Sequence, residues 1–227
     1  QPVRAVALSL LIGSNLGFGL DDLAVPGSAA ALKDIGYILM PKADEDGTEG
    51  QTPQDSQRVQ QHPQHSARLL SEHGGYGPPV IEAVLQHHER WDGSGYPNRI
   101  KGPSISIFAR VVNVADAYYE LVSVRRNRRA LMPHEAVEYI MAYSGEMFDP
   151  DLVRLLVRNV PVYPTGVMVE LSTGEVGVVS EANQGHIGRP VVRICYGKDK
   201  KAELRQYDVD LSHPDHQRVL IVQTLEY

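Results

Sequence analysis

The stretch His87-His88-Glu89-Arg90-Trp91-Asp92-Gly93-Ser94-Gly95-Tyr96-Pro97 joins two adjacent imidazoles to a glycine-rich turn that ends in Tyr-Pro. The residues before it, Pro78 to Leu85, have the proline start and apolar spacing of a helix, which we expect to cover 80–89. Neighbouring helical positions diverge by about 100°, so the two imidazoles are not expected to reach one metal from the same direction, although they can flank one pocket. This stretch predicts one edge of a metal site.

Composition limits the class of protein. The chain has 227 residues, 42% of them hydrophobic and 22% charged, which suffices for one full core and a small second module. The net charge of -6 argues against a DNA- or RNA-binding surface, although a compact phosphate ligand remains possible. Cys195 is the only cysteine, which excludes an intramolecular disulfide and a thiolate zinc cluster and favours the cytoplasm. The apolar run 3–12 is too short to span a membrane and predicts a buried helix.

Periodicity predicts two domains. A helical domain is expected over 1–160 and a small β module over 161–227, so the fold class is mainly α. The expected helices are 3–12, a short helix near 21 that is separate from 29–32, 55–70 with a kink or restart at Pro63, 80–89, 105–122, 133–144 and 149–159. The expected strands are 167–171, 176–179, 191–194 and 219–225. The polar segment 42–54 predicts an exposed loop, either a plain surface loop or a lid.

Five side chains on separate helical segments have the chemistry of a metal centre. A helical bundle that directs imidazole and carboxylate groups into its core can hold a first-row transition metal. The candidates are Asp34, His62, His87, His88 and Asp116. An isolated helix-terminal histidine is more often a surface or capping residue, and we assign that role to the others: His65, His73, His134, His186, His213 and His216.

These motifs resemble the HD-GYP family in order and spacing, from about residue 1 to 160. The matching segments are Leu32–Gly36, His62-Pro63, His87–Pro97 and Ala109–Asp116. The resemblance implies an HD-type helical bundle and metal-dependent hydrolysis of the bacterial messenger cyclic di-GMP to pGpG or GMP. It also implies that Asp34 bridges two metals, that the three histidines bind one of them, and that Asp116 binds the other.

The resemblance also implies a substrate side. Arg125 and Arg128 stand where basic residues contact the phosphates of the ligand, and Gly95-Tyr96-Pro97 shapes the adjacent turn. The wider cluster also includes Arg126 and Arg129, and its simpler interpretation is a solvated helix end. The residues after Pro161 resemble an extension that often follows this domain, to which we assign stability or dimer packing.

The chain departs from the family pattern around one pocket. Lys33 stands in place of the first histidine of the His-Asp motif, Tyr37 in place of a lysine, and Tyr119 in place of an aspartate. Gln1 falls roughly where an N-terminal histidine ligand would be expected. A protonated lysine has no lone pair for a metal, so Lys33 is expected to form an ion pair with Asp34 or Asp116 in the space of a divalent cation.

This substitution predicts one metal ion or none, rather than two or three, and the residues do not choose among Fe, Mn, Zn and Ni. We therefore expect a degenerate domain of cyclic di-GMP signalling with weak or no phosphodiesterase activity. Such a domain would act as a nucleotide sensor or dock a partner such as a GGDEF-type domain. The alternatives are an active phosphodiesterase and an interaction scaffold without nucleotide affinity.

Overall fold

The computed structural model describes residues 2–40, 57–124, 129–183, 186 and 188–225. It divides into two compact units, one made of 1–131 and 138–156 and the other of 132–137 and 157–227. The helices precede a C-terminal antiparallel sheet, so the predicted fold class is confirmed. The two units are a division of the chain by its contacts, and they do not test the domain boundary expected between residues 160 and 161. That boundary stays a prediction.

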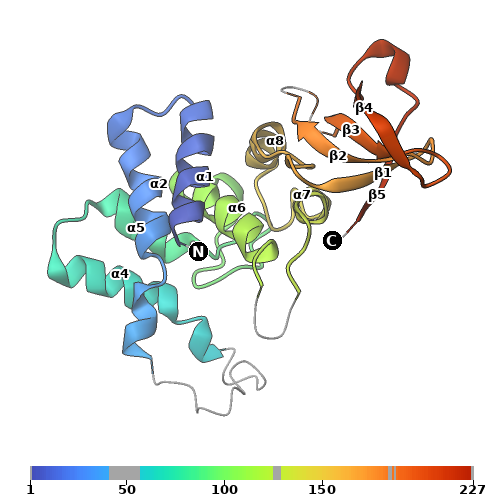
Figure 1. The fold of residues 1–227 in the computed structure, drawn as a ribbon. Helices are drawn as coiled ribbons and strands as arrows, with labels where there is room; N and C mark the ends of the chain where they lie inside the picture. The colour runs from blue at the N-terminus through green and yellow to red at the C-terminus, as the bar shows by residue number, and fades with distance from the viewer. Residues whose placement is uncertain (1, 41–56, 125–128, 184–185, 187, 226–227) are drawn as a thin grey trace, which may run out of the picture. The chain divides into compact units, whose positions relative to one another are not determined.

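The helical unit packs α1 and α2 against the long apolar helix α6 (Figure 1). Helix α5 also contacts α2 and α6, and α4 packs on α5 and on the short 3-10 segment η1. The helices whose bounds are defined among the described residues before the sheet are α1 (Pro2–Asn15), α2 (Leu20–Leu32), η1 (Ile35–Leu39), α4 (His62–His73), α5 (Pro78–Gln86), η2 (Gly102–Ser104), α6 (Ile107–Leu121), α7 (Pro133–Ala142) and α8 (Pro150–Asn159).

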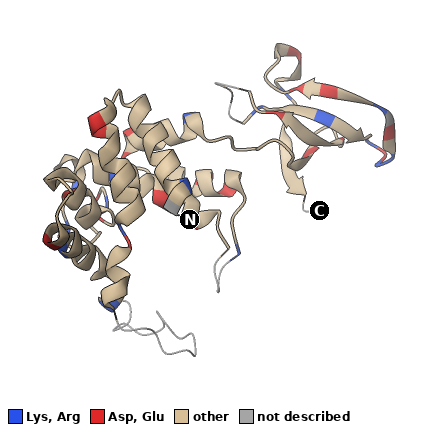
Figure 2. Ribbon diagram, turned by 60° about the vertical axis from the view of Figure 1, so that its left-hand side comes forward, with Lys and Arg blue, Asp and Glu red and all other residues tan. Residues whose placement is uncertain are grey.

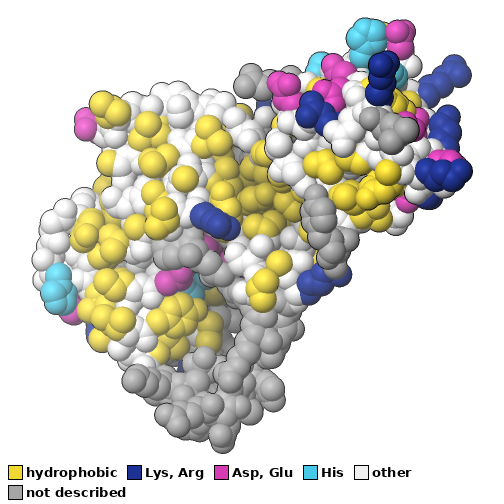
Figure 3. Space-filling model, in the orientation of Figure 1, with side chains coloured by type: hydrophobic (Ala, Val, Ile, Leu, Met, Phe, Trp, Pro, Cys, Tyr) yellow, Lys and Arg dark blue, Asp and Glu magenta, His cyan; other side chains and the backbone are white. Residues whose placement is uncertain are grey.

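The core of the helical unit forms where small residues let helices approach closely. Ala29 on α2, Ala83 on α5 and Ala109 on α6 are completely buried, and larger residues such as Val84 and Val112 fill the space between them. Positions 109 and 112 of α6 are three apart and therefore lie on one face of the helix. Among the described residues, no helix has the length and apolarity needed to cross a membrane. In the space-filling view, apolar side chains are also scattered over the drawn face of this unit (Figure 3).

The predicted break near Pro26 is wrong, because α2 runs without interruption from Leu20 to Leu32. A proline inside a helix costs about 3 kcal/mol, so packing must offset this cost. Pro26 is itself buried, and a Cβ added at Gly27 would lie 3.1 Å from Leu10 of α1. Tertiary contact with α1 therefore keeps the segment helical where local propensity favours a break.

Two predicted helix boundaries also move. Helix α4 begins at His62, with Pro63 in its first turn, where a proline is tolerated. Residues 41–56, which include the predicted loop 42–54, lie outside the described residues. Helix α5 ends at Gln86, before His87, three residues earlier than predicted.

The second unit is a five-stranded antiparallel sheet in the order β4-β3-β2-β1-β5. Its strands are β1 (Met168–Leu171), β2 (Val176–Glu181), β3 (Val191–Tyr196), β4 (Ala202–Asp210) and β5 (Ile221–Leu225), and the 3-10 segment η3 (Pro214–His216) precedes β5. Its buried cluster includes Val169, Val179, Val192 and Ile194. Figure 2 shows acidic and basic residues interspersed along these strands.

Strand β4 is absent from the predicted elements. It lies at one edge of the sheet and pairs only with β3 in the strand order. Most of its described side chains are exposed, and Val209 is its buried hydrophobic residue. An edge strand with polar residues on both faces lacks the alternation of a half-buried strand, and it therefore carries a weak sequence signal.

Gly36 fixes the close approach of η1 to α4. A Cβ at this position would lie 2.4 Å from the His62 carbonyl oxygen and 2.5 Å from the Ser66 nitrogen. We expect Gly36→Ala to lower the free energy of unfolding by about 1–3 kcal/mol, because the backbone must move apart. Gly19→Ala is the control, since a Cβ there meets nothing within 4 Å. Denaturant unfolding that gives equal losses for both variants contradicts this account.

Candidate metal centre

Three histidines converge in the helical unit. His62 begins α4, whereas His87 and His88 follow the end of α5. One ring nitrogen from each lies within 4.8 Å of the other two, and among the described residues no other His, Cys, Asp or Glu group forms such a cluster. The chain turns at His87 and His88 after α5 has ended, so both imidazoles reach the same cluster. This agrees with the expectation that the two rings flank one pocket, and their planes are 42° apart.

The hydrogen bonds of these rings leave lone pairs facing one another. His62 Nδ1 lies 2.7 Å from the Val59 carbonyl oxygen, and His87 Nδ1 lies 2.6 Å from that of Val84. A carbonyl only accepts, so each Nδ1 donates and each neutral ring keeps its lone pair on Nε2. The two Nε2 atoms are 3.3 Å apart. Two nitrogens bound to one zinc ion at about 2.0–2.1 Å with tetrahedral angles would be about 3.3–3.4 Å apart, so the pair fits a shared ion.

Burial keeps these imidazoles neutral, as metal binding requires. Burial lowers the pKa of His62, and it lowers the pKa values of His87 and His88 far below the usual range. The charge of Lys33 lowers all three further. In neutral rings the protons lie on Nδ1, so no hydrogen bond joins His62 Nε2 and His87 Nε2 at neutral pH.

Lys33 lies between two carboxylates. Its Nζ is 2.5 Å from Asp34 Oδ2 and 3.0 Å from Asp116 Oδ2, and its side chain is only 6% exposed. The predicted ion pair is therefore confirmed, and it involves both aspartates. Burial lowers the pKa of Lys33, but the charges of Asp116 and Asp34 outweigh burial, and the pKa is raised. Burial raises the pKa of Asp116 to about 6, so both partners are charged at neutral pH.

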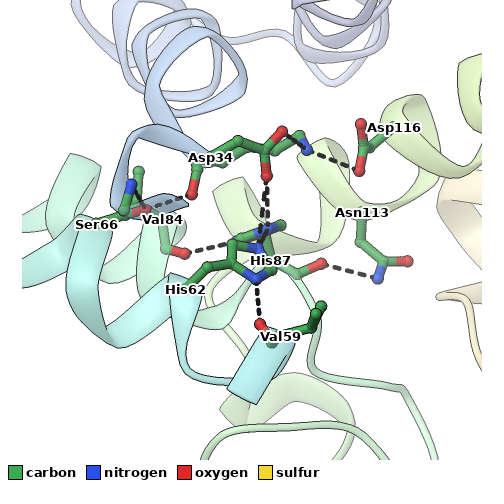
Figure 4. A network of polar contacts seen from close by, with 10 residues as sticks. Asp34, Val59, His62, Ser66, Val84, His87, Asn113 and Asp116 are labelled. Carbon is green, nitrogen blue, oxygen red and sulfur yellow. Dashed lines mark hydrogen bonds and ion pairs between the residues drawn. The ribbon is translucent and has the colours of Figure 1, made fainter. Parts of the chain in front are cut away.

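Asp34 connects the ammonium to the histidines (Figure 4). Its Oδ2 accepts from Lys33, while its Oδ1 lies 3.5 Å from His62 Nε2 and 3.9 Å from His87 Nε2. Asp116 lies across from it on α6. The structure thus brings all five predicted ligand positions together, with Lys33 among them. That they bind a metal stays a proposal.

Two side chains that sequence analysis missed hold the backbone of this centre. Ser66 Oγ donates to the Lys33 carbonyl at 2.6 Å and accepts from the Gly36 nitrogen at 2.8 Å. Ser66 follows His62 by one helical turn, and this spacing is a signal that could have identified it. Asn113 Nδ2 donates to the His87 carbonyl at 3.0 Å. No sequence signal distinguishes this amide from a solvated one.

The Gly-Tyr-Pro turn packs directly on the backbone of residues 88–90. A Cβ at Gly95 would lie 2.5 Å from the His88 carbonyl oxygen and 2.3 Å from the Arg90 nitrogen, so only glycine fits. The Tyr96 ring stacks on His88, with centroids 4.8 Å apart and 28° between the planes. The turn therefore positions His88. The predicted contact of Gly95, Tyr96 and Pro97 with substrate stays a prediction.

A further acidic residue acts on the centre. The charge of Glu120 raises the pKa values of His62 and Asp116. Glu120 follows Asp116 by four positions on α6 and therefore lies on the same face of the helix. This spacing is a signal that sequence analysis left unused. Tyr119, which precedes it, makes a ring contact with Tyr118.

The remaining predicted residues fall outside this centre or outside the described residues. The described residues do not include Gln1, Arg125, Arg126 and Arg128, so the roles expected of them stay predictions. Of the histidines assigned structural or surface roles, His73 bonds the Leu69 carbonyl and His134 stacks on Tyr163.

This arrangement defines a helical bundle with a centre of histidines and aspartates, in which His62 and His87 are buried and Asp34 is half exposed. The model of the HD domain family matches residues 5–152, and the chain therefore belongs to that family. The resemblance to cyclic di-GMP phosphodiesterases of the HD-GYP type is also confirmed by its relatives.

Two curated relatives are similar over much of the chain. A cyclic di-GMP phosphodiesterase of Pseudomonas aeruginosa is 33% identical over 92% of this chain and 50% of its own length. The cyclic di-GMP phosphodiesterase response regulator RpfG of Xanthomonas campestris is 34% identical over 66% of this chain and 40% of its own. The chain thus spans half or less of these relatives.

Solved structures support the fold. A cyclic GMP-AMP specific phosphodiesterase of Vibrio cholerae aligns with a TM-score of 0.54 and 22% identity, over 68% of this chain and 42% of that one. An HD-GYP protein of Bdellovibrio bacteriovorus aligns with a TM-score of 0.57 and 20% identity, over 68% of this chain and 49% of that one. At this identity the likeness concerns the fold alone.

Ser66→Ala should weaken metal binding at the histidine cluster about tenfold, because it frees the Lys33-Asp34 backbone from α4. It should also destabilise the protein by about 1–3 kcal/mol, since a buried carbonyl and a buried N–H lose their partner. The matched control is Ser71→Ala, whose hydroxyl bonds only the Ala67 carbonyl of the same helix. Isothermal titration of metal-free protein with Zn²⁺ measures the affinity. Equal affinities for the two variants contradict the role of Ser66.

The metal-free protein should lose stability as pH falls below about 6.5. The folded state lowers the pKa values of His62, His87 and His88. As pH falls, these histidines therefore bind protons in the unfolded chain while they stay neutral in the folded protein. Each contributes up to about 1.4 kcal/mol per pH unit between 6.5 and its folded pKa. Asp116 has the opposite effect on stability. Its pKa is raised to about 6 in the folded state, so its protonation stabilises the folded protein as pH falls through that range.

Denaturant unfolding at pH 7.5 and pH 5.5, with chelator present, measures this slope. His87→Asn should reduce it, whereas His73→Asn, a change at an exposed position, should leave it unaltered. A wild-type stability that rises toward pH 5.5 contradicts the assignment of neutral buried imidazoles.

Proposed function

We propose that this chain is a degenerate cyclic di-GMP-binding domain of the HD-GYP type with weak or no phosphodiesterase activity. It binds the dinucleotide as a sensor or docks a signalling partner such as a GGDEF-type domain. One observation carries the proposal, the insertion of the Lys33 ammonium between Asp34 and Asp116 at 2.5 and 3.0 Å. We place the protein in the cytoplasm and regard a homodimer as compatible with this role.

Charge supports a reduced metal count. Two carboxylates with one ammonium carry a net charge of about -1, whereas the same carboxylates without Lys33 would offer two charges to a divalent cation. A cation next to the ammonium would be repelled at short range, because the Lys33 side chain is buried and its charge is weakly screened there. One position, formed by Asp34 and the three histidines, keeps its ligands for a single Fe, Mn, Zn or Ni ion.

In this function the clustered residues would hold one metal ion. His62, His87 and His88 hold the ion through neutral ring nitrogens, and Asp34 supplies one oxygen while its other oxygen holds Lys33. A bound ion would supply acidification of a water and neutralisation of phosphate charge. The Lys33 ammonium, held by two carboxylates, cannot acidify a water as a metal ion does, so binding is retained better than hydrolysis. Arg125 and Arg128 remain proposed phosphate contacts.

The alternative is an active phosphodiesterase. The intact cluster of three histidines favours it, because these residues supply a complete half of a metal centre. The names of the relatives, which are cyclic di-GMP phosphodiesterases, favour it as well. In this case Lys33 would leave Asp34 and Asp116 when metal is supplied, and a residue from outside the aligned motifs would serve as the replacement ligand.

Metal content and turnover separate the two functions. We expect the wild-type protein, purified anaerobically, to hold at most one transition-metal ion per chain and to release pGpG or GMP slowly or not at all with Mn²⁺ or Fe²⁺. Lys33→His should raise the metal content toward two ions, because an imidazole can bind where an ammonium cannot. Elemental analysis and chromatography of the nucleotide products measure these quantities.

Lys101→His is the matched control, since it places the same change at an exposed lysine and should leave the metal content unchanged. Activity need not return in Lys33→His, because Tyr37 and Tyr119 also differ from the family pattern. Two ions per chain with rapid hydrolysis in the wild-type protein overturn the degenerate function and establish the alternative. Tight binding of cyclic di-GMP in calorimetry excludes a scaffold without nucleotide affinity.

A further inference from the structure

Tyr37 offers an aromatic face beside the histidine cluster. Its ring stacks on the imidazole of His62, with centroids 4.4 Å apart and 12° between the planes. His62 is completely buried, whereas Tyr37 retains 43% exposure. A buried partner therefore fixes one face of the ring while much of the side chain still meets solvent. Such a ring is held in place before any ligand arrives, which reduces the ordering cost of binding.

The residues that follow Tyr37 on η1 are apolar, and the half-exposed carboxylate of Asp34 precedes it. Ile38 and Leu39, which follow it on η1, are 71% and 42% exposed. The nearby cation of the same segment, Lys33, is buried and engaged by Asp34 and Asp116. A ligand that approaches η1 thus meets an aromatic and apolar surface rather than an ammonium. Among the parts of a nucleotide, the base is the one that binds such a surface, because every base has a π face.

We propose that Tyr37 is a base-stacking residue, and that a purine ring of the bound nucleotide lies against its exposed side. This inference rests on the proposed nucleotide-binding function and names a specificity determinant for it. Stacking tolerates different bases, because it uses the ring face rather than hydrogen-bonding edges. Tyr37 therefore accepts guanine and adenine alike, and it selects for the presence of a base rather than for its identity.

A pair of simple ligands tests this role. GMP and ribose 5-phosphate carry the same sugar phosphate and differ in the base. Calorimetry on the metal-loaded protein should give tighter binding of GMP than of ribose 5-phosphate, and similar binding of GMP and AMP. Tyr37→Leu should weaken GMP binding about tenfold and leave ribose 5-phosphate binding unchanged. Tyr37→Phe should bind GMP as the wild type does, because it keeps the ring.

Ile38→Ala is the matched control, since it removes exposed apolar surface from the same segment without removing a ring. Elemental analysis must give equal metal content for all variants. Tyr37→Leu that binds GMP as tightly as the wild type overturns the stacking role and leaves the proposed function standing. An equal loss for both ligands in Tyr37→Leu also overturns it, because the ring would then only support the centre. Wild-type protein that binds neither GMP nor cyclic di-GMP overturns both proposals.

Discussion

The contact of one buried ammonium with two carboxylates determines how the rest of the centre is arranged. Lys33 Nζ draws one oxygen of Asp34 away from the histidines, while the other oxygen stays directed toward them. A buried ion pair contributes little net stability, because desolvation of the charges offsets their attraction. Its consequence is geometric. It fixes the rotamer of Asp34 and keeps Asp116 on α6 directed toward the α2–η1 junction.

The centre depends on backbone contacts as much as on its charged side chains. Ser66 ties both ends of the short Lys33–Gly36 segment to α4, and Gly36 allows the backbones to approach. On the other side, Gly95 lets the Gly-Tyr-Pro turn fold back on His88. Each imidazole thus sits on a segment that is fixed by a neighbour, which is the arrangement that precise placement of ligands requires.

Sequence analysis could predict the parts of this structure that repeat or that carry unusual chemistry. Helix α6 was predictable because its apolar residues recur at helical spacing, and Lys33 was informative because an ammonium does not bind metals. The continuous helix α2 was not predictable, since contact with α1 overrides the local effect of Pro26. Strand β4 was missed because it lies at the edge of the sheet, where polar and apolar residues need not alternate along the strand. Ser66 and Asn113 resemble any polar residue until the chain is folded.

Two tyrosines, Tyr37 and Tyr96, contact the histidine cluster through their rings. Tyr37 stacks on His62 and Tyr96 stacks on His88, so an aromatic ring contacts each of two histidines of the cluster. Neither contact requires a second metal ion, and neither is disturbed by Lys33. In the proposed function, ligand binding through these rings and one ion is therefore separable from hydrolysis, which needs an acidified water held in line with the scissile bond. In that proposal the Lys33 ammonium removes hydrolysis, whereas the ring contacts of Tyr37 and Tyr96 are kept.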